Sequence, residues 1–269
     1  MNSTALKFLA YIRSINLKVK SLLNELNINK ELLPCIEAFI ANSLMLSIAW
    51  DLRRGRPVKL NKHFTRVSNA LRRGGGVSRL IDICRFYNCV LKGKYTVVAD
   101  LGCGLGLNLV MVNRYLGKFV FMVGLDKDVF FLKLLKSILS DVDVIQADVS
   151  FLPIRDESLD MVFITGVIHE LPDLRVMDES KRTVKAGGII FIGDFVLRYV
   201  PSLILKFIRF LKVKLGLEPE TPFTLMDIVT KIKSLSLVIE EIYAHWKFLV
   251  TGKIIIVLRR PLVGAGGGI

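Results

Sequence analysis

Hydrophobic residues follow two different spacings along this chain of 269 residues. In the first third they recur every three or four positions, which predicts amphipathic helices. These helices are expected over residues 4–26, 30–52, 62–71 and 78–91. From Tyr95 onward, short apolar and β-branched runs alternate with helical segments. This alternation is typical of an α/β fold with a doubly wound parallel sheet.

The apolar runs of the second part predict the order of the strands. Strands are expected over residues 97–100, 119–125 and 142–146, followed by a fourth that residues 152–163 lead into and a fifth that begins at residue 184 and ends at Asp194. Two more are expected over residues 237–243 and 253–258. A helix is predicted over 108–115 and another over 224–234. The chain therefore divides into a helical basic region (1–94), an α/β domain (95–260) and a tail (261–269) that is expected to be disordered because of its glycines.

A glycine-rich turn follows the first predicted strand. Asp100 ends a short β-branched run, and Gly102, Gly104 and Gly106 come next at two-residue spacing. Glycines let backbone approach a ligand closely, and the following helix would point its free N–H groups at it. The dinucleotide pattern G-x-G-x-x-G would need a glycine at 107, where the chain has Leu107. An ordinary strand-to-helix turn is the alternative for this segment taken alone.

Two further acids follow the next two predicted strands. Asp126 ends the second strand, 24 positions after Gly102, and a carboxylate at that place can accept hydrogen bonds from both ribose hydroxyls of a nucleoside. Asp148 follows the third strand. A single acid of this kind can be a solvated strand end, but three of them in this order favour a nucleoside-binding edge.

The motif D-x-G-x-G-x-G at Asp100–Gly106 resembles motif I of class I S-adenosylmethionine-dependent methyltransferases. Residues 152–163 resemble that family's passage LPF-x-D-x-S-F-D-x-V, and residues 184–192 resemble its LKPGG-x-L-x-I. The resemblance covers about residues 95–260. It implies a Rossmann-like sheet with an antiparallel last strand, preceded here by a helical N-terminal cap, and S-adenosyl-L-methionine as the cofactor.

The resemblance also implies roles for residues. Asp100 would orient the methionine end, where Gly102 and Gly104 bring the backbone close, while Asp126 would hold the ribose and Asp148 the adenine amino group. The complete set of expected cofactor-binding residues is Asp100, Gly102, Gly104, Gly106, Asp126, Asp148, Val149 and Thr165.

His169 is the candidate catalytic residue, because it follows the fourth strand and an imidazole can remove a proton near neutral pH. The alternative is a histidine used for packing. Asp194 and Tyr199 are further candidates. The chain has no Asn-Pro-Pro-Tyr at this point, which argues against methylation of adenine N6 or glutamine side chains.

The basic residues are concentrated before the α/β domain. Residues 1–96 contain 17 of the 38 lysines and arginines but only 5 of the 24 acids. Residues 53–94, together with a predicted cationic amphipathic segment at 198–217, are therefore candidate surfaces for RNA or an anionic membrane. A solvated face is the alternative for the first segment, and a lid or a helix packed on the sheet for the second. The Gly74–Gly76 run is either a linker or a phosphate-accepting lid.

The remaining composition predicts a cytoplasmic protein. Attachment to the surface of a membrane is compatible with this prediction. No apolar run approaches the ~18 residues that span a bilayer. The cysteines are Cys35, Cys84, Cys89 and Cys103; they lack a metal-site pattern and are expected to be small buried hydrophobes, with no metal bound. The predicted function is methyl transfer to a small-molecule or lipid-like acceptor. The alternatives are an RNA methyltransferase and a non-catalytic protein that binds S-adenosylmethionine.

Overall fold

The structure is a computed structural model that describes residues 3–26, 28, 31–73, 76–197, 207, 214, 223–246 and 251–262. Most of the predicted cationic segment at 198–217, with Tyr199, lies outside these residues. So do Gly74, Gly75 and the tail from residue 263. The expectations for those segments therefore stay predictions.

The chain divides into two compact units. Unit 1 comprises residues 1–96 and 103–146, and unit 2 comprises residues 97–102 and 147–269. The elements of unit 1 are α1 (Ser3–Leu26), α2 (Leu33–Arg53), α3 (Leu60–Arg72), α4 (Gly76–Val90), α5 (Leu107–Leu116), η1 (Gly117–Phe119), β2 (Phe121–Asp126), α6 (Val129–Ile138) and β3 (Asp143–Gln146). Those of unit 2 are β1 (Val97–Leu101), β4 (Leu159–Thr165), η2 (Ile168–Glu170), α7 (Arg175–Thr183), β5 (Val184–Leu197), α9 (Leu225–Ser234), β6 (Val238–Trp246) and β7 (Thr251–Arg259).

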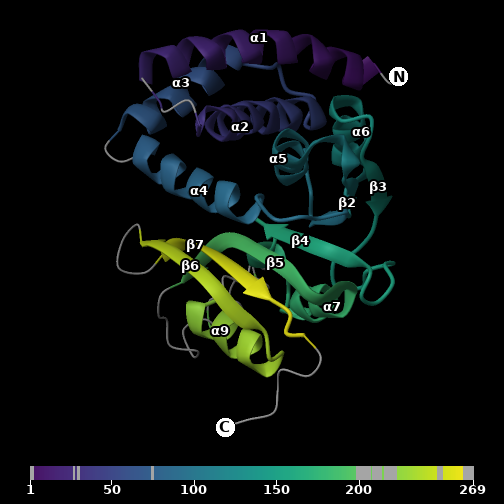
Figure 1. Cartoon of the computed structure of the whole chain (residues 1–269). Helices are drawn as coiled ribbons and strands as arrows, with labels where there is room; N and C mark the ends of the chain where they lie inside the picture. The colour runs from purple at the N-terminus through teal and green to yellow at the C-terminus, as the bar shows by residue number, and fades with distance from the viewer. Residues whose placement is uncertain are drawn as a thin grey trace. The chain divides into compact units, whose positions relative to one another are not determined.

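The strands follow the order β3-β2-β1-β4-β5-β7-β6 in a seven-stranded sheet. In unit 1, β2 pairs with β3 in parallel. In unit 2, β1 pairs with β4 and β4 with β5 in parallel, whereas β7 runs antiparallel to both β5 and β6. The α/β fold with parallel strands and an antiparallel end is confirmed. Figure 1 shows α7 close to β5, which it contacts.

The strands of unit 2 form because both of their faces are buried, as in other parallel sheets. Val98, Ala99 and Leu101 of β1 have no solvent exposure, and neither do Val162 and Phe163 of β4. The acid of the predicted S-F-D-x-V passage secures this arrangement. Asp160 accepts a hydrogen bond from the backbone N–H of Val97 at 2.9 Å. It also forms an ion pair with Lys185 of β5, at 2.6 Å. This acid therefore joins three neighbouring strands.

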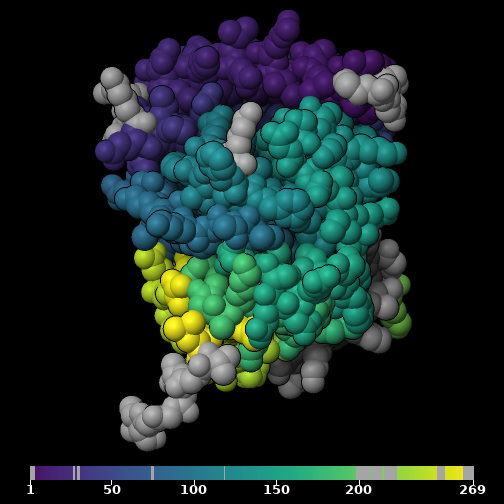
Figure 2. Space-filling model, turned by 45° about the vertical axis from the view of Figure 1, so that its right-hand side comes forward, coloured from purple at the N-terminus to yellow at the C-terminus, as the bar shows by residue number. Residues whose placement is uncertain are grey.

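Unit 1 is organised around α2, which contacts α1, α3, α4 and α5 (Figure 1). Among the described residues, α2 is the helix that is long and apolar enough to cross a membrane by length and composition. Its buried residues, among them Ile36, Leu44 and Ile48, pack against these neighbouring helices. Of the 18-residue stretch of α2 that passes this test, 44% is buried inside the structure. The helix α1 lies against α2 and α6, and Figure 2 shows its purple side chains at the surface of this unit.

The interpretation of all four cysteines as small buried hydrophobes was wrong for three of them: two form a disulfide and Cys89 is exposed. Cys35 of α2 and Cys84 of α4 form a disulfide, with their Cα atoms 5.7 Å apart. Their separation of 49 positions hides the pairing in the sequence, because only the packing of α4 on α2 brings them together. Cys103 is buried, as expected, and Cys89 is exposed.

Local sequence signals fix several helix starts. The side chain of Asp128 accepts a hydrogen bond from the N–H of Phe130 and caps α6. Thr224 and Asp227 form a capping box at α9, in which each side chain accepts from the other residue's backbone N–H. Thr224 also forms a bridge with Leu197, the last residue of β5. The chain therefore leaves β5 and enters α9 at neighbouring positions.

Candidate cofactor and catalytic site

In unit 1 the glycine turn is tied to the carboxylate that ends β2. The N–H of Gly104 donates to Asp126 Oδ2 at 2.9 Å, and the N–H of Cys103 donates to the carbonyl of Leu125. Gly104 and Gly106 have φ values of +50° and +73°, a conformation that favours glycine. A Cβ at Gly104 would meet nothing within 4 Å, whereas one at Gly106 would meet Leu135 of α6 at 2.4 Å. Gly104 is thus the glycine of this unit that leaves open space beside the turn.

Asp126 is held from its other side by the start of α6. Its Oδ1 accepts from the N–H of Asp128 at 2.9 Å, and Asp128 forms an ion pair with Arg53. The Arg53 guanidinium also lies over the rings of Trp50 (5.2 Å) and Phe131 (5.8 Å). One residue of the predicted basic surface therefore supports the loop that follows Asp126.

In unit 2 the same motif begins at Asp100 and Gly102. Asp100 is 1% exposed. Gly102 has a φ of +67°, and a Cβ there would lie 2.3 Å from Cγ2 of Val167. Gly102 was expected to bring the backbone close to the cofactor. It also has a packing role, because its missing side chain leaves room for Val167, which follows β4.

His169 lies in the same cluster, in a pair with Asp194 of β5. Its Nδ1 is 2.7 Å from Asp194 Oδ1, and their side chains are 28% and 0% exposed. The other oxygen, Asp194 Oδ2, accepts from the N–H groups of Val167 (3.0 Å) and Ile168 (2.6 Å). Asp194 therefore fixes the segment after β4 and the imidazole together. Phe195 contacts the ring edge-on, with centroids 6.0 Å apart.

The donors around Asp194 determine the histidine tautomer. A carboxylate that accepts from backbone N–H groups is an acceptor, so Nδ1 of His169 carries the hydrogen of their contact. In the neutral imidazole, Nε2 is then the nitrogen without a proton. The sequence pointed to both residues separately, but the separation of 25 positions gave no sign of their contact.

The other expected cofactor residues of unit 2 lie on the loops after β3 and β4. Asp148 is exposed, and its Oδ1 accepts from the N–H of Ser150 at 2.8 Å, which fixes the carboxylate within its own turn. Val149 is buried. Thr165 ends β4 opposite Gly193 of β5.

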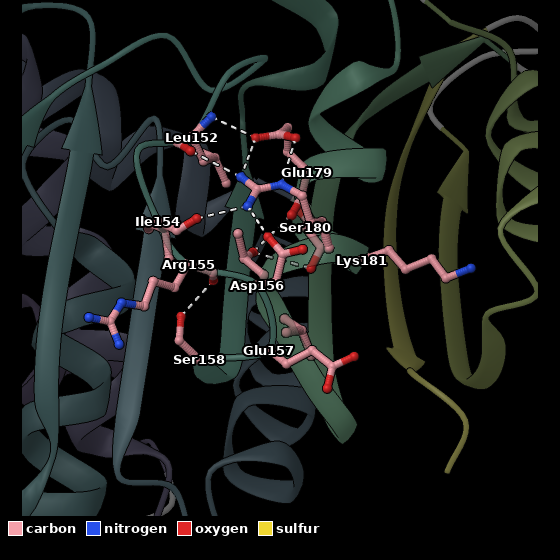
Figure 3. Close-up of polar contacts among 12 residues, drawn as sticks. Leu152, Ile154, Arg155, Asp156, Glu157, Ser158, Glu179, Ser180 and Lys181 are labelled. Atoms are coloured by element: carbon pink, nitrogen blue, oxygen red, sulfur yellow. Dashed lines mark hydrogen bonds and ion pairs between the residues drawn. The ribbon is translucent and has the colours of Figure 1, made fainter. Parts of the chain in front are cut away.

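An arginine that sequence reasoning missed holds the loop after Val149. Arg182 of α7 donates to the carbonyls of Leu152 (3.0 Å) and Ile154 (2.8 Å), and its Nε and Nη2 donate to Glu179 at 3.0 and 2.7 Å. Nη1 also donates to Asp156 at 2.6 Å. Figure 3 shows Leu152, Ile154 and Asp156 from the loop gathered near Glu179 of the helix. The hydrogen bond from Arg182 lowers the pKa of the Glu179 carboxyl below its ordinary value.

These residues fit S-adenosylmethionine by their chemistry. Each oxygen of Asp126 accepts one backbone hydrogen bond, and a carboxylate can accept about four, so it retains capacity for two ribose hydroxyls. Gly104 leaves open space beside this carboxylate's loop. Among the described residues no cluster of His, Cys, Asp and Glu could hold a metal ion.

The comparisons with known proteins agree with the motif. Residues 99–192 match the family model described as "Methyltransferase domain". The geranyl diphosphate C-methyltransferase of Streptomyces coelicolor A3(2), solved with S-adenosyl-L-homocysteine, superposes with a TM-score of 0.55 at 14% identity and covers 69% of this chain and 81% of its own.

Two other solved structures show how widely this fold is used. The arsenic(III) S-adenosylmethionine methyltransferase of Chlamydomonas reinhardtii has a TM-score of 0.51 at 19% identity and covers 63% of this chain and 64% of its own. The [4+2]-cyclase SpnF has a TM-score of 0.53 at 15% identity and covers 66% and 80%. At these identities the likeness shows the fold. Residues 99–192 match the methyltransferase family model and the solved structures share the fold, so together they support a class I methyltransferase domain in this chain with S-adenosylmethionine as its cofactor.

Proposed function

We propose that this protein transfers the methyl group of S-adenosylmethionine to a small-molecule or lipid-like acceptor, and that His169 removes the acceptor's proton. The observation that carries the proposal is the His169–Asp194 pair, fixed at 2.7 Å beside the segment that packs on Gly102. The cofactor supplies an activated methyl group and leaves as a neutral thioether, so the protein mainly orients the reactants and handles a proton.

The pair divides the work between its two residues. Nε2 of His169 accepts the proton of a hydroxyl or an acidic carbon as that atom bonds to the methyl group. Asp194 is a positioning residue: it holds Nδ1–H and keeps the ring turned in one direction. Because the same carboxylate also holds Val167, the base and the turn at Gly102 are supported together. We propose that Gly104 and Asp126 contact the ribose of the cofactor. The residues proposed to lie near its adenine and its reacting end are Asp148, Val149 and Thr165.

The acceptor class is tested with S-adenosylmethionine labelled in its methyl group. The purified protein is incubated with three fractions of one cell extract: small molecules, lipids and total RNA. We expect label in the small-molecule or lipid fraction. Label in RNA alone would select the RNA methyltransferase alternative, and no label in any fraction despite cofactor binding would select the non-catalytic alternative. A [4+2]-cyclase shares this fold, so the fold alone does not fix the reaction and the transferred label is the necessary readout.

The role of His169 is tested with the acceptor found in that experiment. His169→Ala should lower kcat by about 100-fold or more, because general bases contribute roughly that much, while the Kd of S-adenosylmethionine stays within threefold. Asp194→Asn should lower kcat and also change the rising limb of the pH–rate profile, which a merely structural residue would leave in place. His245→Ala on β6 is the matched histidine control. Unchanged kcat in His169→Ala would refute the assignment.

A further inference from the structure

A concave pocket lies in unit 1 where α2 ends and α3 begins. It has a volume of about 680 Å³, and four of its lining residues are cationic: Arg56, Lys59, Lys62 and Arg66. The two helices, α2 and α3, contact each other (Figure 1). All the lining residues fall between positions 51 and 69. The pocket is therefore complete within this unit.

The pocket carries a strong excess of positive charge. The single acidic residue that lines the pocket is Asp51. Its carboxylate is paired with His63, whose Nε2 lies 2.7 Å from Asp51 Oδ2. Both of these side chains are 19% exposed, so this pair forms part of the wall. Among the described residues, the four cations form no ion pair. Placing like charges around one hollow raises their mutual repulsion, which an anion in that hollow relieves.

Neighbouring basic residues behave differently. Arg53 pairs with Asp128, Arg72 pairs with Glu25, and Arg85 lies 3.7 Å from Asp82. Arg54 lies over the ring of Trp50 at 5.0 Å. The predicted basic surface is therefore divided: some of its cations contact neighbouring residues of the fold, whereas four others gather at the pocket.

The start of α3 adds further attraction for an anion. This helix of 13 residues has Lys59 at its N-cap with no side-chain capping hydrogen bond, and no acid lies in its first turn. The first backbone N–H groups of a helix have no intrahelical partner, and they carry the positive end of the helix dipole. Lys59, Lys62 and His63, which surround this end, all line the pocket.

We propose that this pocket binds the phosphate group of a phosphorylated small molecule or lipid headgroup. Several cations and a helix N-terminus around one hollow suit a compact, multiply charged group. A long nucleic acid would instead need a basic track along many residues. The proposal concerns a site separate from the predicted cofactor residues, and it does not depend on methyl transfer.

The test uses inorganic pyrophosphate as the probe, in calorimetric titrations of the full chain at low salt. The variant Lys59→Ser/Lys62→Ser/Arg66→Ser should weaken pyrophosphate binding at least tenfold. The control Lys7→Ser/Arg13→Ser/Lys20→Ser removes the same charge from exposed positions of α1 and should change it less than twofold. Both variants should keep the wild-type melting temperature within a few degrees and the wild-type Kd for S-adenosylmethionine.

Vesicles and RNA distinguish the source of the phosphate. Binding to phosphatidic acid vesicles that pyrophosphate competes away, with none to phosphatidylcholine vesicles, would assign the site to a lipid headgroup. Pyrophosphate binding without vesicle binding would assign it to a soluble phosphorylated compound. The proposal is overturned if the wild type does not bind pyrophosphate, if both triple variants lose binding equally, or if only tRNA binding depends on the pocket.

Discussion

The interactions of Arg182 lead to a quantitative prediction about stability. Arg182→Ala removes the two hydrogen bonds to Glu179 and those to the carbonyls of Leu152 and Ile154. Its side chain is 32% exposed and that of Glu179 is 20% exposed, so water screens these contacts in part. Asp156 is 71% exposed, and its contact is given no weight. We expect a loss of about 2–3 kcal/mol in the free energy of unfolding.

Thermal and urea unfolding of the purified protein measure this loss. A change of that size lowers the melting temperature of a chain of this length by about 5–10 °C. The matched control is Arg155→Ala, which removes an exposed arginine from the same loop and should change stability by less than about 0.5 kcal/mol. Equal stabilities of the two variants would refute the reasoning.

The same prediction has a pH dependence with a definite sign. Arg182 lowers the pKa of folded Glu179, so this contribution is fully present above the ordinary glutamate pKa of about 4.3. It is lost as the pH falls through the lowered value in the folded state. The difference in stability between the wild type and Arg182→Ala should therefore narrow in acid. A difference that stayed constant from pH 7 to pH 3 would contradict a charge-dependent contact.

Two predictions concern the glycine turn and its carboxylate. Asp126→Ala should weaken S-adenosylmethionine binding by about 1–3 kcal/mol, because the ribose hydroxyls lose their acceptor. The control Asp143→Ala, at the start of β3, should leave this affinity unchanged. Calorimetry that showed wild-type affinity in Asp126→Ala would exclude Asp126 from the ribose site. Gly104→Ala and Gly117→Ala each place a Cβ on a residue with positive φ in open space, so both should lose about 1 kcal/mol of stability. Gly104→Ala alone should also weaken cofactor binding, at least tenfold, and equal affinities would show that the space beside Gly104 is not used.

Strand positions were predictable because buried parallel strands leave continuous apolar runs in a sequence. Their ends were less predictable because tertiary pairing decides them. The fifth strand was expected to end at Asp194 but continues to Leu197, where it pairs with the first residues of β7. The second was expected to begin at Phe119, but Gly117–Phe119 forms a 3₁₀ turn and Phe119 is 94% exposed. Local hydrophobicity does not distinguish these cases.

The sequence suggested candidate site residues where a polar residue follows a predicted strand at a suitable spacing. Asp126 and His169 were identified in this way, and the structure gives both of them fixed surroundings. Arg182 was missed because an arginine on a short helix has the pattern of a solvated surface residue. Its partners Leu152 and Ile154 lie 30 and 28 positions earlier in the chain. Contacts between distant segments leave no spacing that a single sequence reveals.

Asp194 illustrates why such a contact matters for function. One carboxylate on β5 accepts from the backbone after β4 at Val167 and Ile168, and also from the imidazole of His169. Val167 in turn fills the space that a side chain at Gly102 would take. A shift of this segment would therefore move the turn's packing partner and the proposed base in the same direction. Under the proposed function, the geometry of methyl transfer would thus depend on a residue that need not touch either reactant.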